Sequence, residues 1–470
     1  MTSANPQANP NDETPVEATG RCPIVLLLAF SLAWLLVSGT LAFIAGVQAH
    51  TPAFMAGCPI LTYGHTRALQ DTAFTYGWIA NCGLALVTWI LGRLGGHPLR
   101  AANWMGVGAL FWNIAVAAGM VGIATGSATA LTSLQIPGHI QPLMLAAYAS
   151  IAVAGVLAWC GRSRPSLYAA QWYGVALLFL FPWIFSVAQV MLVWAPVHGV
   201  LQAIVEGWYA QSLWTLWMAP IALAGAYYVV PRVTGRVIPG YDLALLGFWS
   251  LIFIGGWTGG RHLIGGPVPA WIPTIAIVAS VLLLPHYIIV LLNLGGAFTR
   301  NPADREGGRS LAFISFGLAA YVLGGAVDSV TGIRSVAAAI QFTWFDEAQR
   351  QLAVYGGVTM MLFGTLYYAL PRLAGRAWAS ASLARGHLIL SCIGIVLLVV
   401  GTAGAGIVQG SDLSTAGVSF AAIATDVHPW LSVGSVAHAT LLLGNILLAI
   451  NFAMTVGCGR LRAAAEALSS

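Results

Sequence analysis

The sequence predicts an all-α integral membrane protein, a bundle of about twelve transmembrane helices, and three observations support this fold class. First, 59% of the residues are hydrophobic and only 7% are charged, with a mean hydropathy of +0.83. This balance is typical of polytopic membrane proteins. Second, apolar runs long enough to cross ~30 Å of hydrocarbon recur about twelve times. Third, the number of arginines alternates from one intervening loop to the next.

The apolar runs and the arginines between them also predict the orientation of the bundle. The runs lie at 22–48, 71–95, 101–126, 139–161, 168–196, 199–230, 240–262, 269–297, 309–333, 346–372, 384–409 and 432–458. Arginines gather after the even-numbered runs: Arg93, Arg100, Arg162, Arg164, Arg232, Arg236, Arg300, Arg305, Arg309, Arg372, Arg376, Arg385, Arg460 and Arg462. Because positive charge favours the cytoplasmic side, both termini are expected on the cytoplasmic side of the membrane.

The ends of the chain differ in composition from the rest. Residues 1–20 are polar and contain neither a basic residue nor an apolar stretch. They therefore lack the features of a signal peptide and are predicted to form a disordered cytoplasmic tail. Residues 21–460 are predicted to form one membrane domain in contact with the lipid bilayer, and residues 461–470 a cytoplasmic tail.

Several classes of function are excluded by composition. All nineteen basic residues are arginine, which excludes chemistry that depends on a lysine. The arginines are spread singly between apolar runs, so the basic balance does not indicate nucleic-acid binding. The six cysteines form neither a C-x-x-C nor a C-x-x-C-H motif, which excludes covalent attachment of a c-type haem.

A weak internal repeat links two of the predicted helices. The sixth ends in AYYVVPRVTGR (226–236), and the tenth ends in LYYALPRLAGR (366–376). Interfacial tyrosine and arginine are common membrane anchors. The repeat therefore fits either two similar helix ends or a true internal symmetry, and the sequence does not decide between them.

Polar residues gather at the ends of four helices, all on the predicted outer side. They are Gln70, Glu206, Gln211, Arg261, His262, Gln349 and Gln351. Residues two apart on a helix point about 200° apart, so Gln349 and Gln351 are expected to face opposite neighbours. The buried Arg261 is expected to pair with Glu206, Asp346 or Glu347, or with water.

The chain resembles subunit I of the haem-copper oxidases, most closely the C-type (cbb(3)-type) cytochrome c oxidases. The segments that carry the resemblance are GFWSLIFI, YYVVPR, GTLYYALPR and HLILSCIGIVLLVVGTAGAGIVQG, and it extends over about residues 22 to 458. It implies the twelve-helix fold of that subunit. In the family, histidines of the second and tenth helices bind two haems, and histidines of the sixth and seventh bind a copper ion.

The resemblance places altered residues at most of these ligand positions. Gln70 matches the histidine of the second helix, and Gln349 and Gln351 match the His-x-His pair of the tenth. Gln211, Arg261 and His262 match the copper ligands, so His262 alone keeps its residue type. Gly255 matches the tyrosine that the family links to a copper ligand. The family implies haem b and copper. The substitutions predict the loss of the six-coordinate haem and of the copper site, because a glutamine amide is a much weaker donor to iron than imidazole, and they leave open whether any haem is bound.

Three functions remain open. The first is a non-catalytic structural, assembly or regulatory partner of other respiratory-complex subunits or of a c-type cytochrome. The second is a divergent terminal oxidase that reduces oxygen or nitric oxide with unconventional haem ligation. His198, His286, His428 and His438 are the remaining histidines in or near helices. The third is a carrier of a small molecule or an ion, with Glu206, Arg261 and Asp328 along its path. These three charged residues fit equally a buried ion pair that holds helices together.

Overall fold

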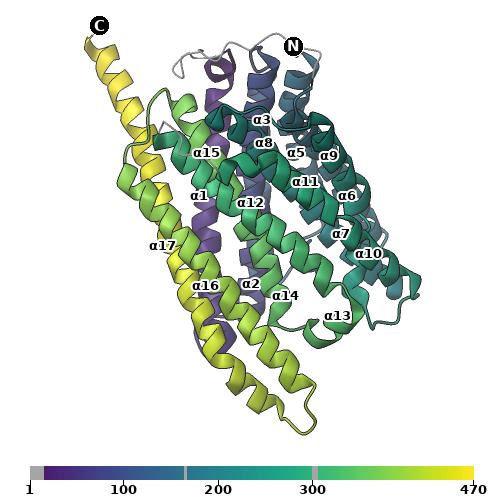
Figure 1. Ribbon diagram of the computed structural model, residues 1–470. Helices are drawn as coiled ribbons and strands as arrows, with labels where there is room; N and C mark the ends of the chain where they lie inside the picture. The colour runs from purple at the N-terminus through teal and green to yellow at the C-terminus, as the bar shows by residue number, and fades with distance from the viewer. Residues whose placement is uncertain (1–14, 164–166, 299–304, 470) are drawn as a thin grey trace.

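The computed structural model describes residues 15–163, 167–298 and 305–469 of the chain. Within these ranges the regular secondary structure is entirely helical (Figure 1). Twelve helical stretches of the described residues are long and apolar enough to cross a membrane, which confirms the predicted fold class. We refer to them as spans 1 to 12 in chain order.

Six spans are single helices, two change helix type near one end, span 8 is broken at Leu283 and ends in a 3-10 turn, and three contain a π-helical segment in the middle. The single helices are α1 (Pro15–His50), α4 (Ala102–Ala124), α5 (Gln141–Cys160), α12 (Arg305–Thr331), α16 (Ala381–Leu413) and α17 (Phe420–Ser469). Span 5 is α6 (Ala169–Gln189) with η3 (Val190–Trp194), span 7 is α9 (Tyr241–Gly255) with η5 (Thr258–Leu263), and span 8 is α10 (Trp271–Leu282), α11 (Leu284–Leu294) and η6 (Gly295–Phe298). Three spans are interrupted by a π-helical segment. Span 2 consists of α2 (Tyr63–Thr72), η2 (Ala73–Ile79) and α3 (Ala80–Gly95), and span 6 consists of α7 (Val200–Ser212), η4 (Leu213–Met218) and α8 (Ala219–Thr234). Span 10 consists of α14 (Trp344–Gln351), η7 (Leu352–Thr359) and α15 (Met360–Ala374). Two short helices, η1 (Pro59–Leu61) and α13 (Arg334–Ile340), lie in connections.

The structure corrects the predicted ends of the chain. Helix α1 begins at Pro15, so residues 15–20 are helical and the prediction of disorder is wrong for them, whereas residues 1–14 lie outside the described residues. This first turn is ordered because Glu17 accepts hydrogen bonds from Trp89 Nε1 at 2.9 Å and Arg93 NH1 at 3.0 Å. At the other end, α17 continues as a helix through 461–469.

The last span also begins earlier than predicted. Helix α17 starts at Phe420 and not near residue 432. The apolar pattern missed the first turns because they carry Asp426, His428 and Pro429 and are less apolar than the rest. The hairpin of α16 and α17 extends beyond the other spans at the lower end of Figure 1. The start of α1 and the end of α17 both lie at the upper end, as an even number of crossings requires.

Spans 2, 6 and 10 form the centre of the bundle. In the most apolar 18-residue stretch of each of these spans, 94%, 94% and 83% of the residues are buried inside the protein. The corresponding share is 39–56% in the other nine spans. The outer spans face lipid with their remaining surface. Polar side chains on the three central spans are therefore shielded from hydrocarbon by the protein itself, which is where a membrane protein tolerates them.

Each central span contains a π-helical segment close to its polar end. The segments are η2, η4 and η7, and they follow directly the turns that carry Gln70, Gln211 and Gln351. Isolated π-helical turns are uncommon and occur often at functional sites. Because each inserts extra backbone into the helix, it changes the direction in which the preceding polar turn faces.

The opposite ends of the central spans repeat a second feature. An arginine lies over an aromatic ring one turn earlier in each span: Arg93 over Trp89 at 5.5 Å, Arg232 over Tyr228 at 3.8 Å and Arg372 over Tyr368 at 3.6 Å. A left-handed glycine then ends each helix, at Gly96, Gly235 and Gly375. The repeat seen in spans 6 and 10 thus includes span 2, which favours internal symmetry over a coincidence of two helix ends.

The three aromatic rings meet on the axis of the bundle. Their centroids lie 5.4 Å apart for Trp89 and Tyr228, 6.3 Å for Trp89 and Tyr368, and 6.1 Å for Tyr228 and Tyr368. We call these three residues the aromatic triad. It closes the end of the bundle that is predicted to face the cytoplasm.

Close packing of the centre depends on small residues, which leads to a first prediction. A Cβ added at Gly364 of span 10 would lie 2.6 Å from the Ser310 carbonyl oxygen of span 9, whereas at Gly434 of span 12 it would meet nothing within 4 Å. We expect Gly364→Ala to lower the free energy of unfolding by about 1–3 kcal/mol. Gly434→Ala is the matched control, and its gain in helix propensity should leave stability equal or higher. Titration of the purified protein with a denaturing detergent measures both. Equal midpoints for the two variants would contradict the packing described here.

Candidate functional site

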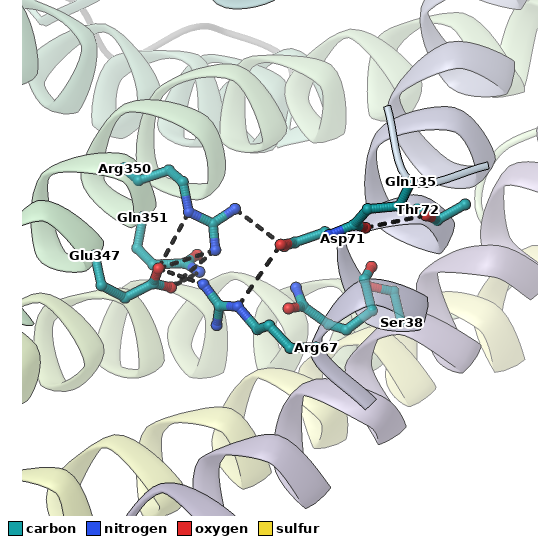
Figure 2. A network of polar contacts seen from close by, with 9 residues as sticks. Ser38, Arg67, Asp71, Thr72, Gln135, Glu347, Arg350 and Gln351 are labelled. Atoms are coloured by element: carbon teal, nitrogen blue, oxygen red, sulfur yellow. Dashed lines mark hydrogen bonds and ion pairs between the residues drawn. The ribbon is translucent and has the colours of Figure 1, made fainter. Parts of the chain in front are cut away.

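Four charged side chains join spans 2 and 10 at the polar end of the bundle (Figure 2). Arg67 and Asp71 come from α2, and Glu347 and Arg350 come from α14. Arg350 NH1 lies 3.1 Å from Asp71 Oδ1 and its NH2 lies 2.9 Å from Glu347 Oε1. Arg67 contacts Glu347 through its NH2 and lies 3.6 Å from Asp71 Oδ2 through its Nε. We call this group the charge quartet; each of its side chains contacts two others, and its formal charges cancel.

The quartet is only partly open to solvent. The exposed fraction of its side chains runs from 14% for Glu347 to 38% for Arg350. Side chains this far removed from water lose part of their hydration energy. The opposite charges of their partners must offset that loss. Two of its contacts, Arg67 with Glu347 and Arg350 with Asp71, join α2 to α14 and form only when both helices are in place, whereas the other two lie within one helix.

Gln351 and Gln70 lie next to the quartet, against a small cavity between spans 1, 2, 10 and 12. Gln351 Nε2 donates to Glu347 Oε1 at 2.7 Å. The side-chain oxygen of Gln70 is buried with no hydrogen-bond partner among the described residues, while its backbone oxygen accepts from Ser38 Oγ at 3.2 Å. The small cavity that both glutamines line has a volume of about 20 Å³, enough for about one water molecule.

Aromatic packing fills the space beside this small cavity. Phe74 of span 2 and Tyr355 of span 10 stack with their ring centroids 5.5 Å apart, and Tyr355 bonds to Asn445 of α17. Both rings line the small cavity together with the two glutamines. Spans 2 and 10 therefore pack directly on each other at the position of Gln70 and Gln351.

A second polar cluster forms on the other side of span 10. Arg261 NH2 contacts Asp328 Oδ1, and Arg261 NH1 donates to the Asp328 carbonyl oxygen at 3.1 Å. Gln349 Nε2 donates to Asp328 Oδ1 at 2.7 Å, and its Oε1 accepts from Thr331 Oγ1 at 3.1 Å. Gln349 and Gln351 thus face opposite neighbours, which confirms that prediction.

The partner predicted for Arg261 is wrong. Arg261 forms its ion pair with the carboxylate of Asp328 on α12. It does not pair with Glu206, Asp346 or Glu347, the three carboxylates expected from the sequence. Glu347 instead belongs to the quartet, where it pairs with Arg67 and Arg350. Glu206 accepts hydrogen bonds from the backbone N of Thr132 at 2.8 Å and from its Oγ1 at 3.1 Å, so it holds the loop between spans 3 and 4. Arg261 and Asp328 form the buried ion pair that the sequence left as one interpretation, and Glu206 is separate from it.

A larger cavity of about 440 Å³ connects the two polar clusters. It is lined by the quartet, by Arg261, Asp328 and Gln349, and also by Gln211 and His262. The structure therefore brings five of the polar residues singled out in the sequence to one cavity, namely Gln211, Arg261, His262, Asp328 and Gln349. Gln70 and Gln351 lie in the adjoining small cavity, and Glu206 lines neither.

The space around Gly255 is narrow. A Cβ added there would lie 3.0 Å from Thr215 Cβ, and Thr215 Oγ1 donates to the Gly255 carbonyl oxygen at 3.1 Å. A large side chain at this position would require spans 6 and 7 to move apart.

The remaining histidines do not gather into a ligand set. Both ring nitrogens of His286 are hydrogen-bonded, to the Gly247 carbonyl oxygen at 2.7 Å and to Tyr321 Oη at 2.9 Å. His428 packs edge-on against His50, and His198 is exposed. His438 lines the small cavity. Among the described residues, no group of three or more His, Cys, Asp or Glu is arranged to hold a metal ion.

Several residues of the site could not be recognised from the sequence. Arg67 and Asp71 are spaced as a helical i,i+4 pair, which signals only a local contact. Their partners on α14 are about 280 positions away in the chain. The loop residue Ser133, whose carbonyl oxygen accepts from Tyr76 Oη at 2.8 Å and which lines the larger cavity, gave no signal at all.

Nine spans around three buried central spans, with charged and amide side chains at one end of those three, define a polytopic membrane protein whose polar site lies inside the bundle. The family described as Cytochrome C and Quinol oxidase polypeptide I matches residues 23–460, and the chain belongs to this family.

Individual relatives are distant but extend over most of the chain. Cytochrome c oxidase subunit 1 of Rhodobacter capsulatus is 25% identical and aligns with 90% of this chain and 83% of its own length. The Cbb3-type cytochrome c oxidase subunit CcoN1 of Stutzerimonas stutzeri is 23% identical, with 91% and 93% covered. A solved chain from the cryo-EM structure of a heme-copper terminal oxidase dimer superposes with a TM-score of 0.74 at 13% identity, over 92% of this chain and 83% of that one. The fold is that of a haem-copper oxidase subunit I.

The charge quartet leads to a second prediction. In Glu347→Gln, Arg67 and Arg350 would lose their shared carboxylate and share Asp71 alone. We expect this change to lower the free energy of unfolding by about 1–3 kcal/mol, since two partly buried arginines then share one carboxylate and one positive charge is not compensated. Glu206→Gln is the control, because a glutamine oxygen can still accept from Thr132. Detergent titration compares the two. A loss in the control as large as that in Glu347→Gln would mean that the quartet does not stabilise the bundle.

Proposed function

We propose that this chain keeps the architecture of oxidase subunit I without its redox centres. It would act in a bacterial inner membrane as a non-catalytic structural, assembly or regulatory partner in a respiratory pathway. The proposal rests on the match between the altered residues and the family's ligand positions, and on the chemistry of the residues that stand there.

The residues at the proposed low-spin haem position do not fit a haem. Gln70 and Gln351 offer amide groups, and iron in b-type sites is held by imidazole. The cavity that they line holds about 20 Å³, and the stacked rings of Phe74 and Tyr355 pack beside it. A haem there would have to separate spans 2 and 10 and displace side chains of the quartet.

The residues at the proposed copper position do not fit copper. His262 lies beside Arg261, whose guanidinium has no acceptor for a metal. Gln211, the third position, is a weak oxygen donor. The space at Gly255 is taken by Thr215, so the tyrosine position cannot be filled without repacking.

The observation that carries the proposal is the charge quartet itself. In the family, a haem held by the second and tenth helices would link them. In this chain, two arginines and two carboxylates make that connection directly. A bundle tied in this way needs no haem to hold its central helices together, which suits a structural or assembly role beside other respiratory subunits or a c-type cytochrome.

One observation favours a second candidate, a divergent terminal oxidase. His438 of α17 lines the small cavity that also contains Gln70 and Gln351. It is the histidine best placed to bind a haem if spans 2 and 10 separated. A single imidazole beside two amides makes this candidate the weaker one.

Metal and haem content tests the proposal. The full chain, purified in mild detergent, is analysed for haem by the pyridine-haemochrome spectrum and for copper by mass spectrometry, with a cbb(3)-type oxidase prepared in parallel as the positive control. We expect haem far below one per chain and no copper above background. One or two b-type haems per chain would overturn the proposal. A His438→Ala variant would then test the second candidate, which predicts that haem is lost.

A further inference from the structure

We propose that an apolar groove between spans 7 and 8 binds one anionic phospholipid, whose headgroup pairs with Arg334. The groove lies on the outside of the bundle, where α10 stands at its margin (Figure 1), and it has a volume of about 370 Å³. It shares no lining residue with either polar cavity. The inference therefore goes beyond the proposed function and is independent of haem content.

The groove is long, shallow and almost entirely apolar. Its lining consists of Phe253, Ile254, Trp257, Thr274, Ile275, Val278, Ala279 and Leu282. The large side chains of the rim are well exposed, for example Phe253 at 67% and Leu282 at 53%, whereas the small Ala279 between them is 5% exposed and forms the floor. From Thr274 to Leu282 the helix rises about 12 Å. A depression of this shape suits an acyl chain that lies along the helix.

One end of the groove lies at the level of the lipid headgroups. Trp257 after α9 and Trp271 at the start of α10 are 63% and 62% exposed. Exposed tryptophans at the ends of spans mark the membrane interface. Leu282, at the other end of α10, is deeper in the hydrocarbon. A lipid with its chain in the groove therefore has its headgroup beside Trp257 and Thr274.

An arginine is held at this interfacial end. Arg334 is the first residue of α13 and is exposed. Its NH2 donates to Thr274 Oγ1 at 2.6 Å, and this hydroxyl in turn donates to the Ala270 carbonyl oxygen at 2.7 Å. A guanidinium has five N–H donors, so others remain for a ligand. The groove and the cation are thus joined through one lining residue, Thr274.

The charge of Arg334 is not balanced by the protein around it. It takes part in no ion pair among the described residues. Neither the connection between spans 7 and 8 nor α10 nor α13 contains an acidic residue. The nearest carboxylates along the chain are engaged elsewhere, since Asp328 pairs with Arg261 and Asp346 accepts from the backbone N of Phe342. The counter-charge must come from outside the chain.

The groove and the arginine together select the ligand. The groove alone does not, because the acyl chains of the bilayer are as apolar as its lining. A guanidinium binds a phosphate group with two parallel hydrogen bonds, which fixes the headgroup at Arg334. A zwitterionic lipid carries an ammonium that offsets its own phosphate, whereas an anionic lipid leaves a net negative charge for the arginine. A helix of another protein could cover the groove but would bring no phosphate.

Photo-crosslinking in the groove tests the proposal. In the full-length chain, p-benzoylphenylalanine is incorporated in place of Val278, at the rim of the groove. The protein is reconstituted into nanodiscs that contain equal amounts of phosphatidylglycerol and phosphatidylcholine with identical acyl chains, and mass spectrometry counts the adducts of each lipid. We expect phosphatidylglycerol to be captured about fivefold more often, which corresponds to about 1 kcal/mol for one arginine near anionic lipid.

A matched position provides the control. Val396 of α16 is 52% exposed, as Val278 is, and lies outside the groove. The same replacement there should capture the two lipids about equally. The proposal fails if the two positions give the same ratio. It also fails if the probe in the groove captures a second copy of the chain instead of lipid, because the groove would then be a protein interface.

Variants of the arginine identify the group that reads the headgroup. Arg334 is exposed and forms no ion pair among the described residues, so its replacement is expected to leave folding intact. Combined with the probe in place of Val278, Arg334→Gln should lower the capture ratio to that found at Val396. Arg334→Lys keeps the charge without the planar fork and should retain a preference of at least about twofold. An undiminished preference in Arg334→Gln would exclude Arg334 as the headgroup site and contradict the proposal.

Discussion

The structure depends on one constraint, that a charge inside a membrane bundle needs a partner of opposite sign. Six charged side chains lie around the larger cavity in contacts that satisfy this constraint, four in the quartet and two in the pair of Arg261 and Asp328. Each set joins different spans, so the pairing also fixes which helices are neighbours. The amides of Gln349 and Gln351 extend these sets by hydrogen bonds to Asp328 and Glu347. The pairing supports the proposal that the site needs no prosthetic group to hold its helices together.

The architecture explains why charged and amide side chains can lie within the membrane spans of this protein. Among the spans that the structure describes, only the three central ones are almost fully enclosed by protein. The polar turns of all three lie at the same end, before their π-helical segments. Lipid-facing spans with the same charges would expose them to hydrocarbon. The arginine and aromatic pairs at the opposite ends repeat in all three central spans, so the three spans resemble one another where they close the bundle and differ in the polar residues that they bring to the site.

Much of the fold was accessible from the sequence, and part of the site was. The twelve spans could be predicted from the lengths of the apolar runs, because the thickness of the hydrocarbon layer fixes the length of a spanning helix. The opposite directions of Gln349 and Gln351 could be predicted from the angle between residues two apart on a helix. The sequence did not reveal that Arg261 pairs with Asp328, because three carboxylates at the same depth were equally good partners by charge alone. The quartet was hidden for a similar reason, since its two halves are far apart in the chain. The π-helical segments have no sequence pattern that marks them, and the start of α1 depends on the contact of Glu17 with Arg93 and Trp89, a tertiary interaction.

The aromatic triad has a consequence for the energy balance of the membrane in which the protein lies. The polar cavity is at one end of the central helices, and Trp89, Tyr228 and Tyr368 meet at the other. Between the two ends the axis is filled by large buried side chains such as Trp78 and Phe363, whose rings lie 5.1 Å apart. Water entering the cavity therefore reaches a dead end. A bundle packed in this way has a polar recess on one face, and we expect it to act as an electrical insulator that does not dissipate the ion gradient of an energised membrane.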